Sequence, residues 1–147
     1  MTKLLATRIG YTLEMGSFRA GVVVVKDGAV LLLFRRKQGE EYYVLPGGSL
    51  EKKESIEEGA IREAKEETGL TVELKKKLWE FEDDDGRVHH YFLVDTFTGE
   101  PMLGGEEAIH NSPQNFYKLD WIPFAALHDT HIISSKVKSL LLEEFAN

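Results

Sequence analysis

Residues 48–70 read GSLEKKESIEEGAIREAKEETGL and hold seven carboxylates within 23 positions. Ser55 and Glu58 have the spacing of a capping box, in which each side chain accepts the other residue's backbone amide at the start of a helix. Gly69 is well placed to end that helix, because glycine adopts the left-handed conformation of a C-terminal stop at little cost. These signals predict a helix over about residues 56–68.

Three carboxylates share one stripe of this predicted helix. Glu63, Glu66 and Glu67 stand at positions i, i+3 and i+4, which together cover an arc of about 100°. Lys65 projects away from the stripe, so we expect no cation there to offset the repulsion between like charges. A divalent metal ion would offset it, because hard cations take oxygen ligands. The alternative is a solvated acidic face, which is the usual fate of a charge run.

Gly59 lies on the same stripe, one turn before the carboxylates, where glycine costs about 0.5–1 kcal/mol relative to alanine. Either a ligand approaches the helix there, or the preceding loop packs tightly against it. Beside the acids, an apolar stripe is expected to dock the helix on the rest of the fold, formed by Ile56, Ala60, Ile61 and Ala64.

The flanking sequence predicts a mixture of strands and helices. Two apolar runs around Asp27-Gly28 indicate a hairpin over residues 18–33. Further strands are expected at 42–45, 72–81, 88–97 and 116–122, and an amphipathic helix at 134–145. Because strands and helices do not alternate strictly, the layer arrangement expected is a mixed sheet with helices packed on its faces.

The acidic helix and the loop before it resemble a complete Nudix box. The family pattern is G-x5-E-x7-R-E-U-x-E-E-x-G-U, in which U is a bulky apolar residue. The chain matches every fixed position, with Ala64 small for U, through Gly48, Glu54, Arg62-Glu63-Ala64, Glu66-Glu67 and Gly69-Leu70. The resemblance implies the α/β class, specifically a Nudix-type α/β/α sandwich with a mixed β-sheet, and a single Nudix hydrolase domain over residues 1–147.

The resemblance also implies an activity and a metal site. Family members hydrolyse a pyrophosphate linkage in a nucleoside diphosphate attached to a group X, using Mg²⁺, with Mn²⁺ as a substitute. By position, Glu63, Glu66 and Glu67 resemble the catalytic metal ligands of the family. A backbone carbonyl around Gly47 or Gly48 often adds another ligand, and Gly48 is the position we assign.

Two other box residues resemble a structural pair. Glu54 and Arg62 match the buried pair that orients helix and loop in the family without touching substrate. Together with Gly48 and Gly69, they form the expected structural part of the box.

The acceptor of the water proton is expected to be a box glutamate or an acid from a later loop. Glu106 and Glu107 follow Gly104-Gly105, and Glu107 is the later catalytic candidate. The alternative for both is a pair of solvated loop acids.

Arg35 and Arg36, next to Lys37, are candidates for holding phosphate oxygens of the substrate. Alternate strand residues face opposite ways, so at most two of the three serve one site. A solvated strand end is an equal alternative.

Other polar residues are assigned no role in the site. His89 and His90 are adjacent on a predicted strand and point to opposite faces, so they cannot chelate one metal together. Asp83-Asp84-Asp85-Gly86 lacks the spaced ligands of a calcium loop and is expected to be a turn.

Composition limits the partners. The chain has 18 Lys and Arg against 25 Asp and Glu, a net charge of -7, and no cysteine. A disulfide scaffold and a thiolate nucleophile are thereby excluded, and a nucleic acid polymer is disfavoured.

The longest apolar runs are six residues, against the ~18 that spanning a membrane requires. No secretory signal is evident. We expect a cytoplasmic protein with a small nucleotide-like diphosphate substrate, and the resemblance allows a homodimer, since many relatives dimerise.

The alternative function is a non-catalytic Nudix-fold sensor that binds a nucleotide without cutting it. Among substrates, nucleoside triphosphates, including oxidised ones, come first, followed by nucleotide sugars and dinucleoside polyphosphates. No family subgroup is supported: no proline lies between Gly47 and Glu100, where members of the ADP-ribose type carry one.

Overall fold

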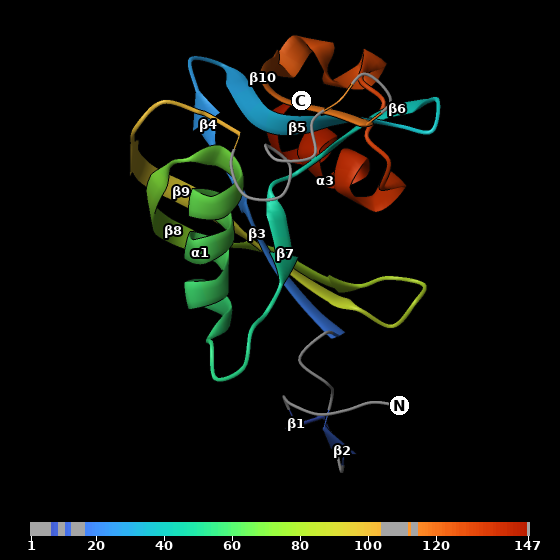
Figure 1. Cartoon of the computed structure of the whole chain (residues 1–147). Coiled ribbons are helices and arrows are strands. Elements are labelled where there is room, and N and C mark those ends of the chain that lie inside the picture. Colours follow the sequence, from blue (N-terminus) through green and yellow to red (C-terminus); the bar gives the residue numbers. More distant parts are fainter. Residues whose placement is uncertain (1–6, 9–10, 13–16, 104–111, 113–114, 147) are drawn as a thin grey trace.

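The computed structural model describes residues 7–8, 11–12, 17–103, 112 and 115–146. Figure 1 shows the course of the chain. In chain order the elements are β1 (Thr7–Arg8), β2 (Tyr11–Thr12), β3 (Phe18–Val23), β4 (Val25–Lys26), β5 (Ala29–Lys37), β6 (Glu40–Val44), β7 (Gly47–Ser49), α1 (Ile56–Thr68), β8 (Thr71–Glu82), β9 (Val88–Thr98), β10 (Asn115–Pro123), the 3₁₀ helix η2 (Phe124–Asp129) and α3 (Ser135–Phe145).

Two four-stranded sheets form the centre of the fold. The first has the order β7-β3-β9-β8 and is mixed, because β3 and β9 run parallel while its other pairs are antiparallel. In the second, β5 pairs with β10 along one edge and with β4 and β6 along the other. Helix α1 packs against β3 on one side, and α3 with η2 lies on the other (Figure 1). The expected α/β class with a mixed sheet and helices on its faces is confirmed.

The predicted first hairpin is confirmed at its turn but not along its whole length. Asp27 and Gly28 have φ values of 51° and 77°, the left-handed values that a two-residue hairpin turn requires. The apolar run before the turn is not one strand, however. Its backbone groups bond two different partners: the Val22 amide donates to the Pro46 carbonyl, whereas the Val24 carbonyl accepts from the Leu31 amide. The run therefore contributes β3 to one sheet and β4 to the other.

Helix α1 buries a narrower stripe than expected. Ala60 and Ala64 are fully buried and pack with Val22 and Phe92 of the sheet. Ile61 is 38% exposed, so its inclusion in the docking stripe was wrong. Ile61 is rotated by about 100° from Ala60, outside the arc that faces β3. Thr68 completes the buried face instead, and its hydroxyl donates to the Ala64 carbonyl, so that no polar atom is stranded there.

The remaining predicted elements are confirmed to within a few residues. The second hairpin is β8 and β9, the later strand is β10, and the C-terminal helix is α3, capped by Ser134. Among the described residues, no helix combines the length and the apolar composition that crossing a bilayer needs.

Candidate active site

The start and the end of α1 are fixed by its own sequence. Ser55 Oγ accepts the Glu58 amide at 3.0 Å, and Glu58 Oε1 accepts the Ser55 amide at 2.9 Å, so the capping box is complete. Gly69 has a φ of 77° and donates its amide to the Lys65 carbonyl. These caps set the rotation and length of the helix, and with them the direction in which its carboxylates project.

Glu54 and Arg62 form the pair expected from the box. Arg62 Nε lies 2.6 Å from Glu54 Oε2, and Arg62 Nη2 lies 3.0 Å from Glu54 Oε1. The two side chains are only 12% and 20% exposed, and Arg62 Nη2 also donates to the Ser49 carbonyl at 3.0 Å. Hydrogen bonds from Arg62 hold the pKa of Glu54 below its usual value. The pair ties the loop after β7 to the helix.

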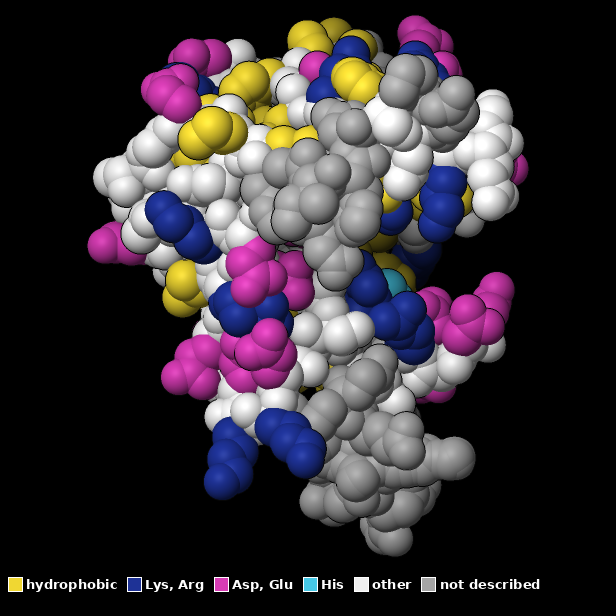
Figure 2. Space-filling view, viewed as in Figure 1, with side chains coloured by type: hydrophobic (Ala, Val, Ile, Leu, Met, Phe, Trp, Pro, Cys, Tyr) yellow, Lys and Arg dark blue, Asp and Glu magenta, His cyan; other side chains and the backbone are white. Residues whose placement is uncertain are grey.

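The sequence predicted no cation beside the three carboxylates, because Lys65 points away from them. That prediction was wrong, because Arg62 lies there. Arg62 Nη1 lies 3.0 Å from Glu63 Oε2 and 3.1 Å from Glu66 Oε1. Lys65 does point away, toward the Gly69 carbonyl. The long guanidinium side chain reaches over a neighbouring position that Cβ spacing alone would place out of range. On the α1 side of the molecule, acidic side chains gather around basic ones (Figure 2).

Glu63 is more enclosed than Glu66, with a side chain 13% exposed against 51%. Burial raises its pKa, although the charges of Arg62 and Arg19 act against the rise. A Cβ built at Gly48 would collide with the Glu63 carboxylate, with the carboxyl carbon only 2.5 Å away. Glycine at position 48 is therefore needed for Glu63 to sit against the strand.

Gly47 joins the helix to the first sheet through both of its polar groups. Its amide donates to Glu67 Oε1 at 2.7 Å, and its carbonyl accepts from Arg19 Nη2 at 3.3 Å. Gly48 stands opposite Ala20 in the β3–β7 register, and the neighbouring strand bonds alternate in direction. The backbone oxygen that points away from β3, on the side of the acids, thus belongs to Gly47.

The donor set suits a hard divalent cation, but its members are turned toward internal partners. Within the described part of the chain, no three His, Asp or Glu side chains are already assembled as a metal site. Arg62 holds Glu63 and Glu66, and Gly47 holds Glu67. Carboxylates with a nearby backbone carbonyl are the ligands that Mg²⁺ prefers, and burial raises the pKa of Glu63 despite the nearby charges of Arg62 and Arg19. Binding a cation here requires these internal partners to be exchanged.

Gly59 is explained by the loop and not by a ligand. A Cβ at this position would collide with Leu50 Cδ2 and would lie 3.2 Å from Glu54 Oε1. Of the two alternatives open from the sequence, the structure favours tight packing of the loop on the helix.

The basic residues of β5 are not brought together. Arg35 lies over the Tyr117 ring, 5.0 Å from its centroid, and donates to the Tyr117 hydroxyl at 3.3 Å. Arg36 is on the opposite face of β5 and donates to Glu41 Oε2 at 2.7 Å. The two arginines therefore cannot bind one phosphate group. Glu106 and Glu107 lie outside the described residues.

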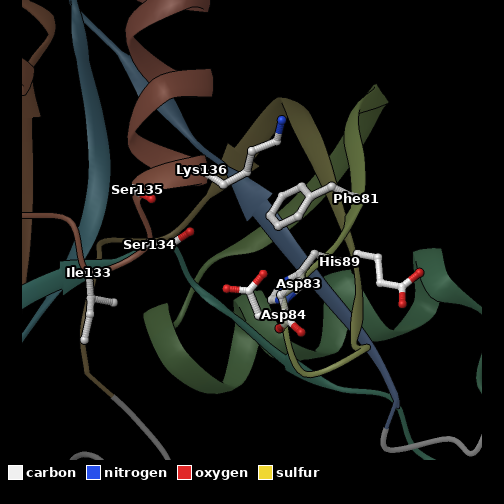
Figure 3. A pocket seen from close by; sticks show the side chains of 9 residues that line it. Phe81, Asp83, Asp84, His89, Ile133, Ser134, Ser135 and Lys136 are labelled. Carbon is white, nitrogen blue, oxygen red and sulfur yellow. The ribbon is translucent and has the colours of Figure 1, made fainter.

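A pocket that the sequence did not reveal lies between the β8–β9 turn and the start of α3 (Figure 3). It has a volume of about 590 Å³. His89 Nε2 lies 2.8 Å from Asp83 Oδ2, and the imidazole stacks on Phe81 at a centroid distance of 4.8 Å. Ile133 and Ser134 line the opposite side. The pairing of strands in the predicted hairpin could have indicated part of this pocket, because it places His89 opposite Phe81.

Known proteins resemble this chain along most of its length. A family model, NUDIX domain, matches residues 17–141. An ADP-ribose pyrophosphatase of Methanocaldococcus jannaschii is 32% identical over 122 residues, covering 79% of this chain and 70% of the relative. An oxidized purine nucleoside triphosphate hydrolase of Danio rerio is 35% identical over 112 residues, covering 72% and 69%.

A solved structure gives the same result for the fold. The MutT NUDIX hydrolase from Burkholderia pseudomallei superposes with a TM-score of 0.66 and 25% identity, covering 88% of this chain and 97% of that protein. With the box geometry described above, these matches show that the chain belongs to the Nudix family and is a Nudix pyrophosphohydrolase.

Proposed function

We propose that this chain hydrolyses a pyrophosphate linkage in a nucleoside diphosphate joined to a group X, and that it uses Mg²⁺, with Mn²⁺ as a substitute. One observation carries the proposal: three carboxylates of α1, Glu63, Glu66 and Glu67, share a face beside the backbone of Gly47. Three carboxylates outnumber the single Arg62 guanidinium that pairs with two of them, so a divalent cation bound there would offset their remaining charge.

Glu63, Glu66 and Glu67 would hold the metal, with the backbone carbonyl of Gly47 as a further ligand in place of Gly48, whose carbonyl points toward β3. When bound, the ion lowers the pKa of the attacking water and neutralises charge that develops on the phosphates. Arg62 would keep its two bonds to Glu54 if Glu63 and Glu66 turned toward an ion, and these bonds would hold the loop on the helix.

Two other roles belong to the proposal. A box glutamate or Glu107 accepts the proton of the attacking water. Of the two β5 arginines, Arg35 is the better candidate for substrate oxygens, because it lies on the same side of β5 as the α1 core. Its side chain lies on the face of β5 that carries Leu31, which packs in the α1 core.

The relatives support the substrate class. One is named for ADP-ribose and another for oxidised purine nucleoside triphosphates. Both of these compounds contain a nucleoside diphosphate attached to a further group, which is the class proposed here. Within it, nucleoside triphosphates come first, followed by nucleotide sugars, ADP-ribose and dinucleoside polyphosphates.

A substrate panel tests the proposal. Each compound is incubated with the protein and Mg²⁺, Mn²⁺ or EDTA, and the products are identified by chromatography and mass spectrometry. The expected result is cleavage of at least one compound at its pyrophosphate linkage, only when metal is present. Tight nucleotide binding without turnover of any compound would instead identify a sensor, and cleavage in EDTA would exclude metal catalysis.

The cytoplasmic location and the homodimer expected from the sequence stay part of this proposal. Light scattering of the purified protein tests the homodimer, which predicts twice the 16.7 kDa mass of the chain.

A further inference from the structure

Arg19 is a half-buried cation with a single weak hydrogen-bond partner among the described residues. It lies on β3, opposite Ser49 of β7 and His89 of β9. Its side chain makes one hydrogen bond, to the Gly47 carbonyl at 3.3 Å. Within the part of the chain that the structure describes, no carboxylate forms an ion pair with it. One of five guanidinium donors is thus engaged, and weakly.

The position of Arg19 connects the acidic site with a pocket. Its charge acts on the Glu63 carboxylate, and Gly47, its acceptor among the described residues, bonds Glu67 through the amide. On its other side, Arg19 lines a cavity of about 150 Å³ together with Leu45 and Tyr91. That cavity shares its residues His89, Ile133 and Ser134 with the larger pocket of Figure 3.

A guanidinium in this situation is suited to an anion. Removing a charge from water without a counter-charge is costly, so a half-buried arginine without an ion pair is satisfied best by a ligand. The planar guanidinium offers paired donors that match two oxygens of a phosphate group. The guanidinium lines the cavity of about 150 Å³ and acts on the nearby carboxylate of Glu63, so a phosphate bound to it would lie next to both.

We propose that Arg19 binds the diphosphate of the substrate and releases the Gly47 carbonyl when it does so. Phosphate oxygens replace the single weak bond to Gly47, and the freed carbonyl becomes available on the side of Glu67. The organic group attached to the diphosphate then points toward the pocket that contains His89. Arg19 therefore decides which end of the substrate faces the acids. This inference rests on the proposed pyrophosphohydrolase function.

The exchange couples two binding events. Without substrate, the Arg19 charge opposes a cation near Glu63 and keeps the Gly47 carbonyl engaged. With a diphosphate bound, both obstacles are removed. Metal and diphosphate should accordingly raise each other's affinity by the same factor.

Two variants and a matched control test this role. Arg19→Gln removes the charge, and Arg19→Lys keeps the charge but loses the paired donors. The control is Lys138→Gln, because Lys138 also donates to a single backbone carbonyl, that of His128 at 2.9 Å, on an exposed part of α3. Circular dichroism and thermal midpoints check that each variant folds.

The first measurement is calorimetric titration of methylenediphosphonate, which cannot be hydrolysed, into protein saturated with Mg²⁺. Arg19→Gln should weaken binding about tenfold or more, since a hydrogen-bonded charge is lost. The affinity of Arg19→Lys should lie between those of Arg19→Gln and the wild type, and Lys138→Gln should bind as tightly as the wild type. Equal affinity of Arg19→Gln and wild type, or no binding by the wild type, overturns the proposal.

The second measurement is a Mn²⁺ titration followed by electron paramagnetic resonance, without any phosphate compound. Arg19→Gln should bind Mn²⁺ as tightly as the wild type or more tightly. A loss of Mn²⁺ affinity would show that Arg19 only supports the acidic site, which contradicts the exchange. Neither measurement depends on turnover: if the wild type cleaves nothing, the proposed function fails while these results still decide the role of Arg19.

Discussion

Arg62 Nη1 lies between two carboxylates of the same helix face, 3.0 Å from Glu63 Oε2, while Nε of the same guanidinium lies 2.6 Å from Glu54. A single side chain thus fixes the loop to α1 and neutralises part of the acidic stripe. The bonds to Glu54 fix the loop, and the Nη1 bonds to Glu63 and Glu66 neutralise the stripe. Loss of Arg62 should therefore affect both the fold and the site.

Arg62→Gln should destabilise the protein by about 2–4 kcal/mol, because it leaves the little-exposed Glu54 carboxylate without its counter-charge. Urea unfolding followed by circular dichroism measures the change. The control is Arg36→Gln, which breaks an exposed pair with Glu41 and should cost about 0–1 kcal/mol. Equal effects of the two substitutions would contradict the structural role of the Arg62 pair.

The Glu54 pair should also give stability a specific dependence on pH. The folded pKa of Glu54 is lowered, so its contribution is complete above the unfolded value of 4.5 and is lost as the pH falls through the folded pKa. The difference in unfolding free energy between wild type and Glu54→Gln should be constant from pH 7 to about 5 and shrink below pH 4.5. Urea unfolding across this range measures it. A difference that grows on acidification would contradict a lowered pKa of Glu54 in the folded protein.

Gly59→Ala should destabilise the protein even though alanine favours helices. The new methyl group would collide with Leu50, and relieving that contact separates the loop from α1. We expect a cost of about 1–3 kcal/mol in thermal or urea unfolding. The same substitution made in a Leu50→Ala background should cost less, because the obstructing side chain is gone. Equal costs in both backgrounds would mean that Leu50 is not the obstacle.

The acidic turn between β8 and β9 should depend on only one of its acids. Asp83 Oδ1 accepts the amides of Asp85 and Arg87, and Oδ2 contacts His89, whereas Asp84 is exposed. Asp83→Ala should therefore cost about 1–3 kcal/mol in urea unfolding, and Asp84→Ala less than about 0.5 kcal/mol. A loss at Asp84 as large as that at Asp83 would contradict this assignment of the turn.

Local signals accounted for the parts of the fold that could be predicted. Helix α1 begins after Ser55 and ends before Gly69 because the capping groups belong to the helix itself. The Asp27-Gly28 turn is likewise local, since its φ values depend on residue type. Nothing local shows that the strand before it divides between two sheets, because the division depends on distant partners such as Pro46.

The site was predictable where the spacing of residues along the helix determines the direction of their side chains. It was not predictable where tertiary contacts determine that direction. Helical periodicity placed Glu63, Glu66 and Glu67 on one face. It did not show that Arg62 reaches two of them, because a flexible side chain chooses among partners only in the folded protein. Arg19 is far from the box in sequence, and only β3–β7 pairing brings it to Gly47.

The most direct test of metal-dependent catalysis is the turnover of Glu67→Gln on a substrate that the wild type accepts, at saturating Mg²⁺. The Gln side-chain oxygen still accepts the Gly47 amide, so folding is retained, while the ligand charge is lost. Glu57→Gln, an exposed acid in the first turn of α1, serves as the control. The account predicts that Glu67→Gln lowers kcat by about 100-fold or more while Glu57→Gln keeps the wild-type rate. A Glu67→Gln protein that turns over at the wild-type rate would contradict it.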